Sequence, residues 1–99
     1  MITFVRTRSI APGKGAEAIA FAQQLSKMAK DKFSVQVNVN VPIGGNPDRL
    51  ATVSSYASLA EFESIALKLV ADADYLKMVA DNAQNFLPGS IHDELWMSM

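Results

Sequence analysis

A histidine and a glutamate stand two residues apart near the end of this 99-residue chain, at His92 and Glu94. Residues two apart on a strand point to the same face, so the carboxylate can orient or charge the imidazole. An imidazole held in this way can act as a general base, which makes His92 the candidate catalytic residue. The structural alternative is a partly solvated histidine at a strand entrance that follows Pro88 and Gly89.

Amide side chains alternate with apolar residues over positions 33–41. On one strand, this pattern places the apolar residues on one face and Gln36, Asn38 and Asn40 on the other. Amides offer paired donors and acceptors to the carbonyl or hydroxyl groups of a ligand, so these three are candidate ligand-binding residues. A solvated sheet face is the alternative interpretation.

Two arginines, Arg6 and Arg8, alternate with a threonine on the first expected strand. Either arginine could bind a carboxylate ligand, or form a structural ion pair with Asp93 or Glu94 on a neighbouring strand. The sequence leaves open which face of the strand carries them.

Two aromatic residues complete the candidate set. Tyr56 and Trp96 can stack on an aromatic substrate, or they can pack in a subunit interface, where both residue types are common. We therefore place them, together with Glu94, among the candidate ligand-binding residues.

The composition is 49% hydrophobic and 19% charged, with a formal net charge of −1. These values are typical of a folded globular protein, and residues 1–99 suit a single domain. Without a basic stripe, nucleic acid is not an expected partner, and no apolar run reaches the roughly 20 residues that span a bilayer. With one histidine and no cysteine, we expect no metal site. The lack of cysteine fits a reducing cytoplasm, the expected location.

Hydrophobic spacing predicts the first half of the chain. Residues 2–10 are rich in β-branched side chains and predict a strand that ends at an Ala-Pro-Gly breaker. Apolar residues at three- and four-residue steps over 15–32 predict an amphipathic helix. Strands are expected at 33–41 and 50–57, paired across a loop rich in turn residues.

A capping box opens the second helical region, because Ser58 and Glu61 match the S-x-x-E pattern. We expect a kink or a second short helix near Asp72, since aspartate prefers caps and turns to helix interiors. Residues 75–86 resume the helical pattern, and 90–99 predict the last strand. The expected inward residues of this region are Leu59, Phe62, Ile65, Ala66 and Leu69, followed by Leu76, Val79, Ala80 and Ala83.

The order of elements is thus β-α-β-β-α-β, the ferredoxin-like or split βαβ arrangement. This order predicts an α+β domain in which helices cover one face of a four-stranded antiparallel sheet. We expect the opposite face to carry Trp96, Tyr56 and Leu50, and apolar surface of this kind marks an interface.

Three segments of the chain resemble the dimeric α+β barrel superfamily, which includes the antibiotic-biosynthesis-type monooxygenases and the NIPSNAP-like proteins. They are residues 11–14 after the first strand, 56–62 at the start of the second helix, and 71–75 where that helix breaks. The resemblance covers nearly the whole chain and implies a homodimer in which two sheets meet face to face. It also implies a pocket between each sheet and its helices, or beside the partner.

The resemblance also bears on cofactors. Haem-degrading members of the superfamily carry a histidine and a tryptophan in the second helical region, and residues 58–86 contain neither. We therefore expect no cofactor.

Two functions follow as hypotheses. The first is a small homodimeric α+β barrel protein that binds a small organic ligand. The alternative is a cofactor-independent monooxygenase or isomerase acting on an aromatic or polyketide-like compound, with His92 as base and Asn38 and Asn40 as positioning groups. A cavity that joins His92 to the two amides would favour the alternative.

Overall fold

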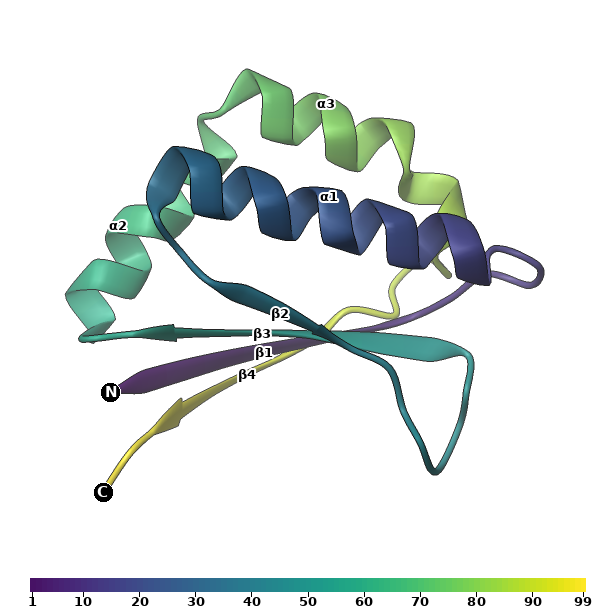
Figure 1. The fold of residues 1–99 in the computed structure, drawn as a ribbon, viewed down its shortest axis with the longest axis horizontal. Helices are drawn as coiled ribbons and strands as arrows, with labels where there is room; N and C mark the ends of the chain where they lie inside the picture. The colour runs from purple at the N-terminus through teal and green to yellow at the C-terminus, as the bar shows by residue number, and fades with distance from the viewer.

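The computed structural model describes all 99 residues and forms two layers, with every helix on one side of the sheet (Figure 1). The elements in chain order are β1 (Ile2–Ser9), α1 (Gly15–Phe33), β2 (Val37–Asn40), β3 (Arg49–Tyr56), α2 (Leu59–Val70), α3 (Ala73–Asp81), the 3-10 turn η1 (Ala83–Asn85) and β4 (His92–Met97). None of the helices combines the length and hydrophobicity that a membrane crossing needs.

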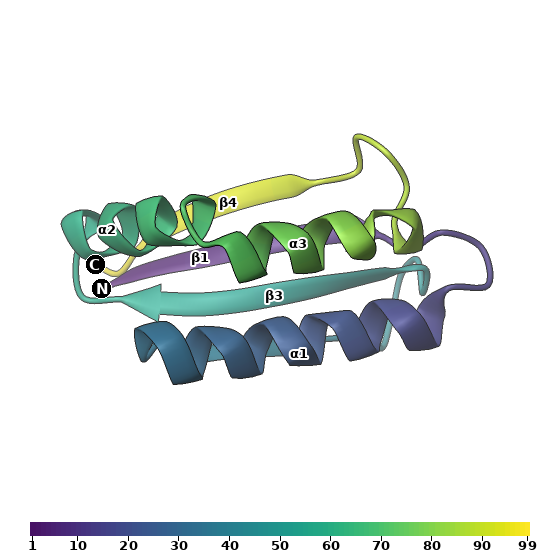
Figure 2. The same ribbon diagram turned by 90° about the horizontal axis from the view of Figure 1, so that it is seen from above.

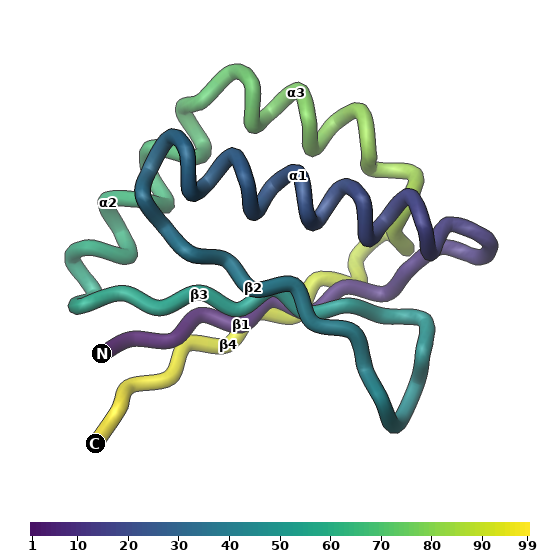
Figure 3. Tube along the Cα trace, viewed as in Figure 1, coloured from purple at the N-terminus to yellow at the C-terminus, as the bar shows by residue number.

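The four strands lie in the order β2-β3-β1-β4, and each neighbouring pair is antiparallel. This topology confirms the predicted α+β, ferredoxin-like fold. Both termini lie at the same end of the molecule (Figure 3), where the amide of Ser98 donates to the carbonyl of Met1 at 3.0 Å.

The helices divide the covered face of the sheet between them. Seen from above, α1 runs along the β2–β3 side, while α2 and α3 lie on the side of β1 and β4 (Figure 2). Two groups of apolar side chains fill the contact between the layers. In the first group, Phe21 of α1 packs against Phe86, with ring centroids 5.7 Å apart. In the second group, the ring centroid of Phe62 of α2 lies 5.2 Å from that of Phe4 and 5.2 Å from that of Tyr56.

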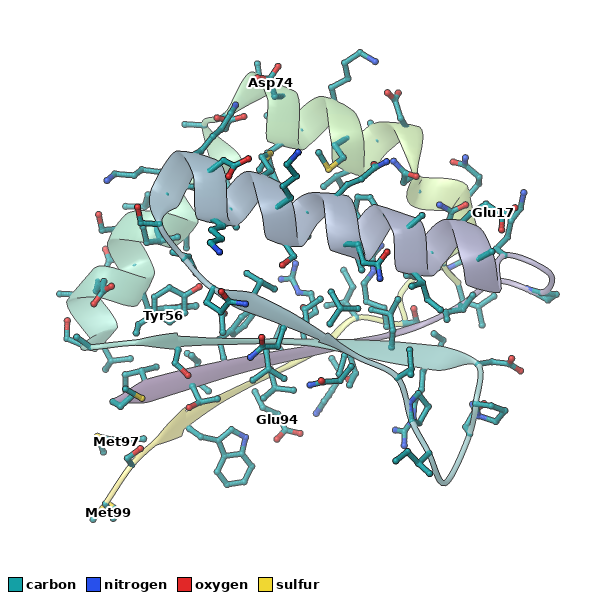
Figure 4. The ribbon with its side chains drawn as sticks, viewed as in Figure 1. Glu17, Tyr56, Asp74, Glu94, Met97 and Met99 are labelled. Carbon is teal, nitrogen blue, oxygen red and sulfur yellow. The ribbon has the colours of Figure 1, made fainter.

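The register pairs Ile2 with Tyr56 and Arg8 with Leu50, so the even-numbered residues of β1 and β3 share one face of the sheet. This is the face that the helices cover. Tyr56 and Leu50 are 6% and 2% exposed, so our expectation that they lie on the open face is wrong. Figure 4 shows Tyr56 between the sheet and α2, on the other side of the sheet from Glu94.

Local hydrogen bonds account for the ends of α2 and α3. The Ser58 hydroxyl accepts from the amide of Glu61 at 3.1 Å, and the Glu61 carboxylate accepts from the amide of Ala57 at 2.9 Å, which confirms the predicted capping box. The Asp72 carboxylate accepts from the amide of Tyr75 at 2.9 Å and starts α3, so the break near Asp72 separates two helices.

Several predicted boundaries and inward residues are wrong, among them Leu59 of α2, which is 58% exposed. Helix α1 continues to Phe33 and ends at Ser34, whose φ of 57° is left-handed, so β2 begins only at Val37. On α3 the inward residues are Tyr75, Met78 and Val79, whereas Leu76 is 49% exposed. The cap at Asp72 starts a new helix, and the phase of that helix does not continue the phase of α2.

Candidate functional site

The interior between the two layers carries charged groups at its centre. Arg6 and Arg8 point from β1 toward the helices, because they share the covered face with Ile2 and Leu50. Three cavities of about 80, 190 and 90 Å³ lie there, and Arg6 and Tyr75 line all three. Each is smaller than a usual ligand pocket of roughly 300–1,000 Å³, but the shared walls bring the three together around these two side chains.

Arg6 is bound to a carboxylate on the neighbouring strand. Its Nε and Nη2 atoms donate to the two carboxylate oxygens of Asp93 at 2.7 and 2.9 Å. These hydrogen bonds lower the pKa of Asp93, against the opposing effect of burial, and raise the pKa of Arg6. The predicted structural ion pair between the first and last strands is therefore present for Arg6.

Arg8 has no such partner. Its guanidinium carbon lies 3.8 Å from the ring centroid of Phe86, and its Nε atom is buried without a hydrogen bond. Burial, and then the like charge of Arg6, lower the pKa of Arg8. An arginine stays protonated even so, because its pKa starts above about 12. Arg8 is therefore a half-buried cation that no carboxylate neutralises.

Hydroxyl groups add to the polar set in this interior. Thr52 and Tyr75 line the same cavity as Arg8. The hydroxyls of Ser54 and Tyr56 lie 3.0 Å apart and are buried. The remaining walls are mainly apolar, and an apolar cavity with a few fixed polar groups is typical of a small-molecule site.

The open face of the sheet carries most of the residues predicted as a site. The register places His92 beside Thr7, Thr7 beside Ala51, and Ala51 beside Asn40 in one row across the sheet. His92 and Asn40 thus lie on opposite edge strands, separated by three strand spacings of about 4.8 Å, or about 14 Å. No cavity of one copy is lined by both residues.

His92, Glu94 and Trp96 form a hydrogen-bonded line along β4. One Glu94 carboxylate oxygen lies 3.0 Å from His92 Nε2, and the other accepts from Trp96 Nε1 at 2.9 Å. The side chain of His92 is 69% exposed and Trp96 is 61% exposed. The sequence therefore predicted which residues share this face, and within one copy the imidazole faces solvent.

The amides of β2 lie at the far edge of the same face. Gln36 donates to the side-chain oxygen of Asn38 at 3.2 Å. Asn40 lines a separate cavity of about 200 Å³ beside the loop of residues 41–48, which projects on the open side of the sheet (Figure 1). Of the predicted ligand-binding residues other than the two arginines, Tyr56 alone lines the interior cavities.

Sequence reasoning did not assign Arg8, Tyr75 and Thr52 to one site. The available signal was a pair of arginines on a strand that packs against two helices, but alternation alone does not say which face is inward. No cluster of three or more His, Cys, Asp or Glu side chains that could hold a metal ion is present.

Solved structures match this chain along its whole length. An uncharacterized NIPSNAP domain protein from Burkholderia xenovorans has a TM-score of 0.82 at 14% identity, with 100% of this chain and 95% of that chain covered. A NIPSNAP family protein from Agrobacterium tumefaciens has a TM-score of 0.81 at 17% identity, covering 99% and 85%. A protein from Nitrosomonas europaea assigned as an antibiotic biosynthesis monooxygenase has a TM-score of 0.77 at 10% identity, covering 100% and 99%.

This chain has their fold. The resemblance predicted from sequence is thus confirmed at the level of fold, and identities this low carry no activity across. No family model and no curated protein matches the chain.

Proposed function

We propose that this protein is a homodimer that binds a small organic ligand between the sheet and the helices of each copy. The observation that carries the proposal is the unfilled space around Arg6 and Tyr75, which line three adjoining cavities. Protein interiors are close-packed, with few voids larger than a water molecule. Space on this scale between the two layers is therefore room for a guest.

The chemistry of this interior favours binding over catalysis. Asp93 is the one carboxylate in the cavity walls, and Arg6 occupies both of its oxygens. The lowered pKa of Asp93 makes it a weak proton acceptor. Thr52, Tyr75 and Arg8 remain as groups that can orient a ligand.

The open face supports the dimer. No helix covers it (Figure 1), and the register places Val5 and Val53 at its centre and Trp96, which is 61% exposed, on its edge strand. A second copy on this face would remove these side chains from water, which is favourable in proportion to the apolar area buried. The superfamily resemblance implies the same face-to-face contact.

A screen for ligands tests the binding function. We expect small organic compounds to raise the melting temperature and to bind with one molecule per subunit in native mass spectrometry. Leu25→Phe places extra bulk in the interior cavities and should weaken binding, whereas Leu67→Phe on the exposed side of α2 should not. Equal binding to both variants would place the ligand elsewhere and contradict the proposal.

One observation favours a second candidate function on the open face. Glu94 holds His92 at 3.0 Å, as a carboxylate holds a general base. With Gln36, Asn38 and Asn40 on the same face, this pair could serve a cofactor-independent monooxygenase or isomerase acting on an aromatic compound, once a second copy encloses it. His92→Gln should then abolish turnover of an aromatic substrate. If the wild-type dimer turns over no such compound, this second function is refuted.

A further inference from the structure

The interior between sheet and helices holds more positive than negative charge. Arg6 and Arg8 both line its cavities, and Asp93 is the one acidic residue in their walls. Because Arg6 and Asp93 neutralise each other, the charge of Arg8 remains.

The environment of Arg8 makes this remaining charge costly. Apolar side chains form most of the cavity around it, and no acidic residue lines that cavity. The guanidinium carbon lies 3.8 Å from the ring centroid of Phe86, and the Nε atom is buried without an acceptor. A buried donor without a partner costs free energy, and the cost is larger for a charged group. An anion bound at Arg8 would reduce this free-energy cost.

We propose that the ligand is an organic acid whose carboxylate binds Arg8 and whose apolar body lies among Phe21, Leu25 and Val79. This inference rests on the proposed binding function and names its ligand class. The three apolar side chains line the same cavity as Arg8, as does the hydroxyl-bearing Thr52.

The neighbouring arginine shows how such a carboxylate would be held. Arg6 binds Asp93 through Nε and Nη2, one oxygen to each nitrogen. In Arg8, two residues along the same strand face, Nε is enclosed by protein atoms, whereas the two Nη atoms have no hydrogen bond and are not fully buried, so they form the edge that a ligand can reach. A planar guanidinium edge matches a carboxylate in this two-point geometry.

The charge count also separates a carboxylate from a phosphate. Arg8 supplies one uncompensated positive charge, and no lysine lines the interior cavities. A carboxylate carries one negative charge, whereas a phosphate group carries close to two at neutral pH. A dianion would leave unbalanced charge in an apolar setting, so the carboxylate is the better match.

Calorimetric titration of the full-length protein tests the inference. The probes are benzoate, 2-naphthoate and octanoate, each paired with its neutral amide, and inorganic phosphate. We expect at least one acid to bind at least tenfold more tightly than its amide and than phosphate. Arg8→Met should remove this preference, while Arg49→Met, an exposed arginine at the end of β3, should keep it.

The stability of the variants keeps the test interpretable. Because the ligand-free protein holds Arg8 unpaired, we expect Arg8→Met to fold and to melt at or above the wild-type temperature. Amides that bind as tightly as the acids, or an acid preference that survives Arg8→Met, would overturn the carboxylate assignment and leave the binding function standing. Failure of every compound in a broad ligand screen to bind would overturn both.

Discussion

Arg6 and Asp93 face each other across β1 and β4, and both carboxylate oxygens of Asp93 accept hydrogen bonds from Arg6. The pair lies in the walls of the interior between the sheet and the helices, where Arg6 lines three cavities and Asp93 lines one. Because this ion pair is internally balanced, the neighbouring Arg8 is the group left to meet a ligand.

The ion pair predicts a pH dependence of stability. Its hydrogen bonds hold the pKa of Asp93 below its usual value of 3.8 in the folded state. A lowered folded pKa stabilises the protein fully above about pH 4, and this contribution is lost as the pH falls through the folded pKa. Urea unfolding should show a loss of about 1 kcal/mol or less, because both side chains are a third or more exposed.

Asp93→Asn should reduce the loss of stability at low pH. Asp31→Asn, which changes an exposed carboxylate on α1, should leave that loss unchanged. If Asp93→Asn loses as much stability at low pH as the wild type, the ion pair does not contribute to stability.

Truncation of the core tests the inward faces of the helices. Phe21 is 4% exposed and packs against Phe86, so Phe21→Ala should lower the free energy of unfolding by about 3–5 kcal/mol. Leu76 points away from the sheet, and Leu76→Ala should change the free energy of unfolding by about 0.5 kcal/mol or less. Denaturant unfolding measures both values. A larger loss for Leu76→Ala than for Phe21→Ala would mean that the face of α3 is wrong.

The sequence predicted the order of elements because local signals determine it. Breakers, helical spacing and the Ser58–Glu61 capping box act within a few residues, and the capping box is present as expected. Which face of each strand lies inward was harder to predict from the sequence. Alternation on β3 shows that Leu50 and Tyr56 share a side, but packing of the helices decides that this side is inward.

The dependence on tertiary packing also explains why the candidate site was only partly predicted from the sequence. Sequence placed His92, Glu94 and Trp96 on one face correctly, since they lie on one strand. The strand order β2-β3-β1-β4 places Asn40 and His92 on opposite edge strands, a consequence of the predicted fold that the sequence reasoning about the site did not draw. Nor could the sequence show that Arg8 is inward, because charged residues are seldom buried.

Assembly through the open face predicts a specific sensitivity to charge. Val53 lies at the centre of that face, so Val53→Asp should place a carboxylate in the interface and convert the dimer to a monomer. Leu67→Asp on the outer side of α2 is the matched control and should leave the mass unchanged. Sedimentation at micromolar concentration distinguishes the two. A wild-type protein that sediments as a monomer would refute the dimer directly.

The single tryptophan offers an independent measure of the same contact. Trp96 is 61% exposed in one copy and lies on the open face. If a second copy covers it, its fluorescence should shift to longer wavelength as the protein is diluted and the dimer dissociates. An emission maximum that is independent of concentration and typical of an exposed indole would exclude Trp96 from the interface.

The proposed function places a small organic ligand in the space between the sheet and the helices. A crystal structure of the protein grown with a compound that raises its melting temperature tests where this ligand binds. We expect electron density for the compound beside Tyr75 and Arg8, with an acidic group within hydrogen-bond distance of the Arg8 guanidinium. Density for the compound on the open face near His92, with side chains closed over the interior, would contradict this placement.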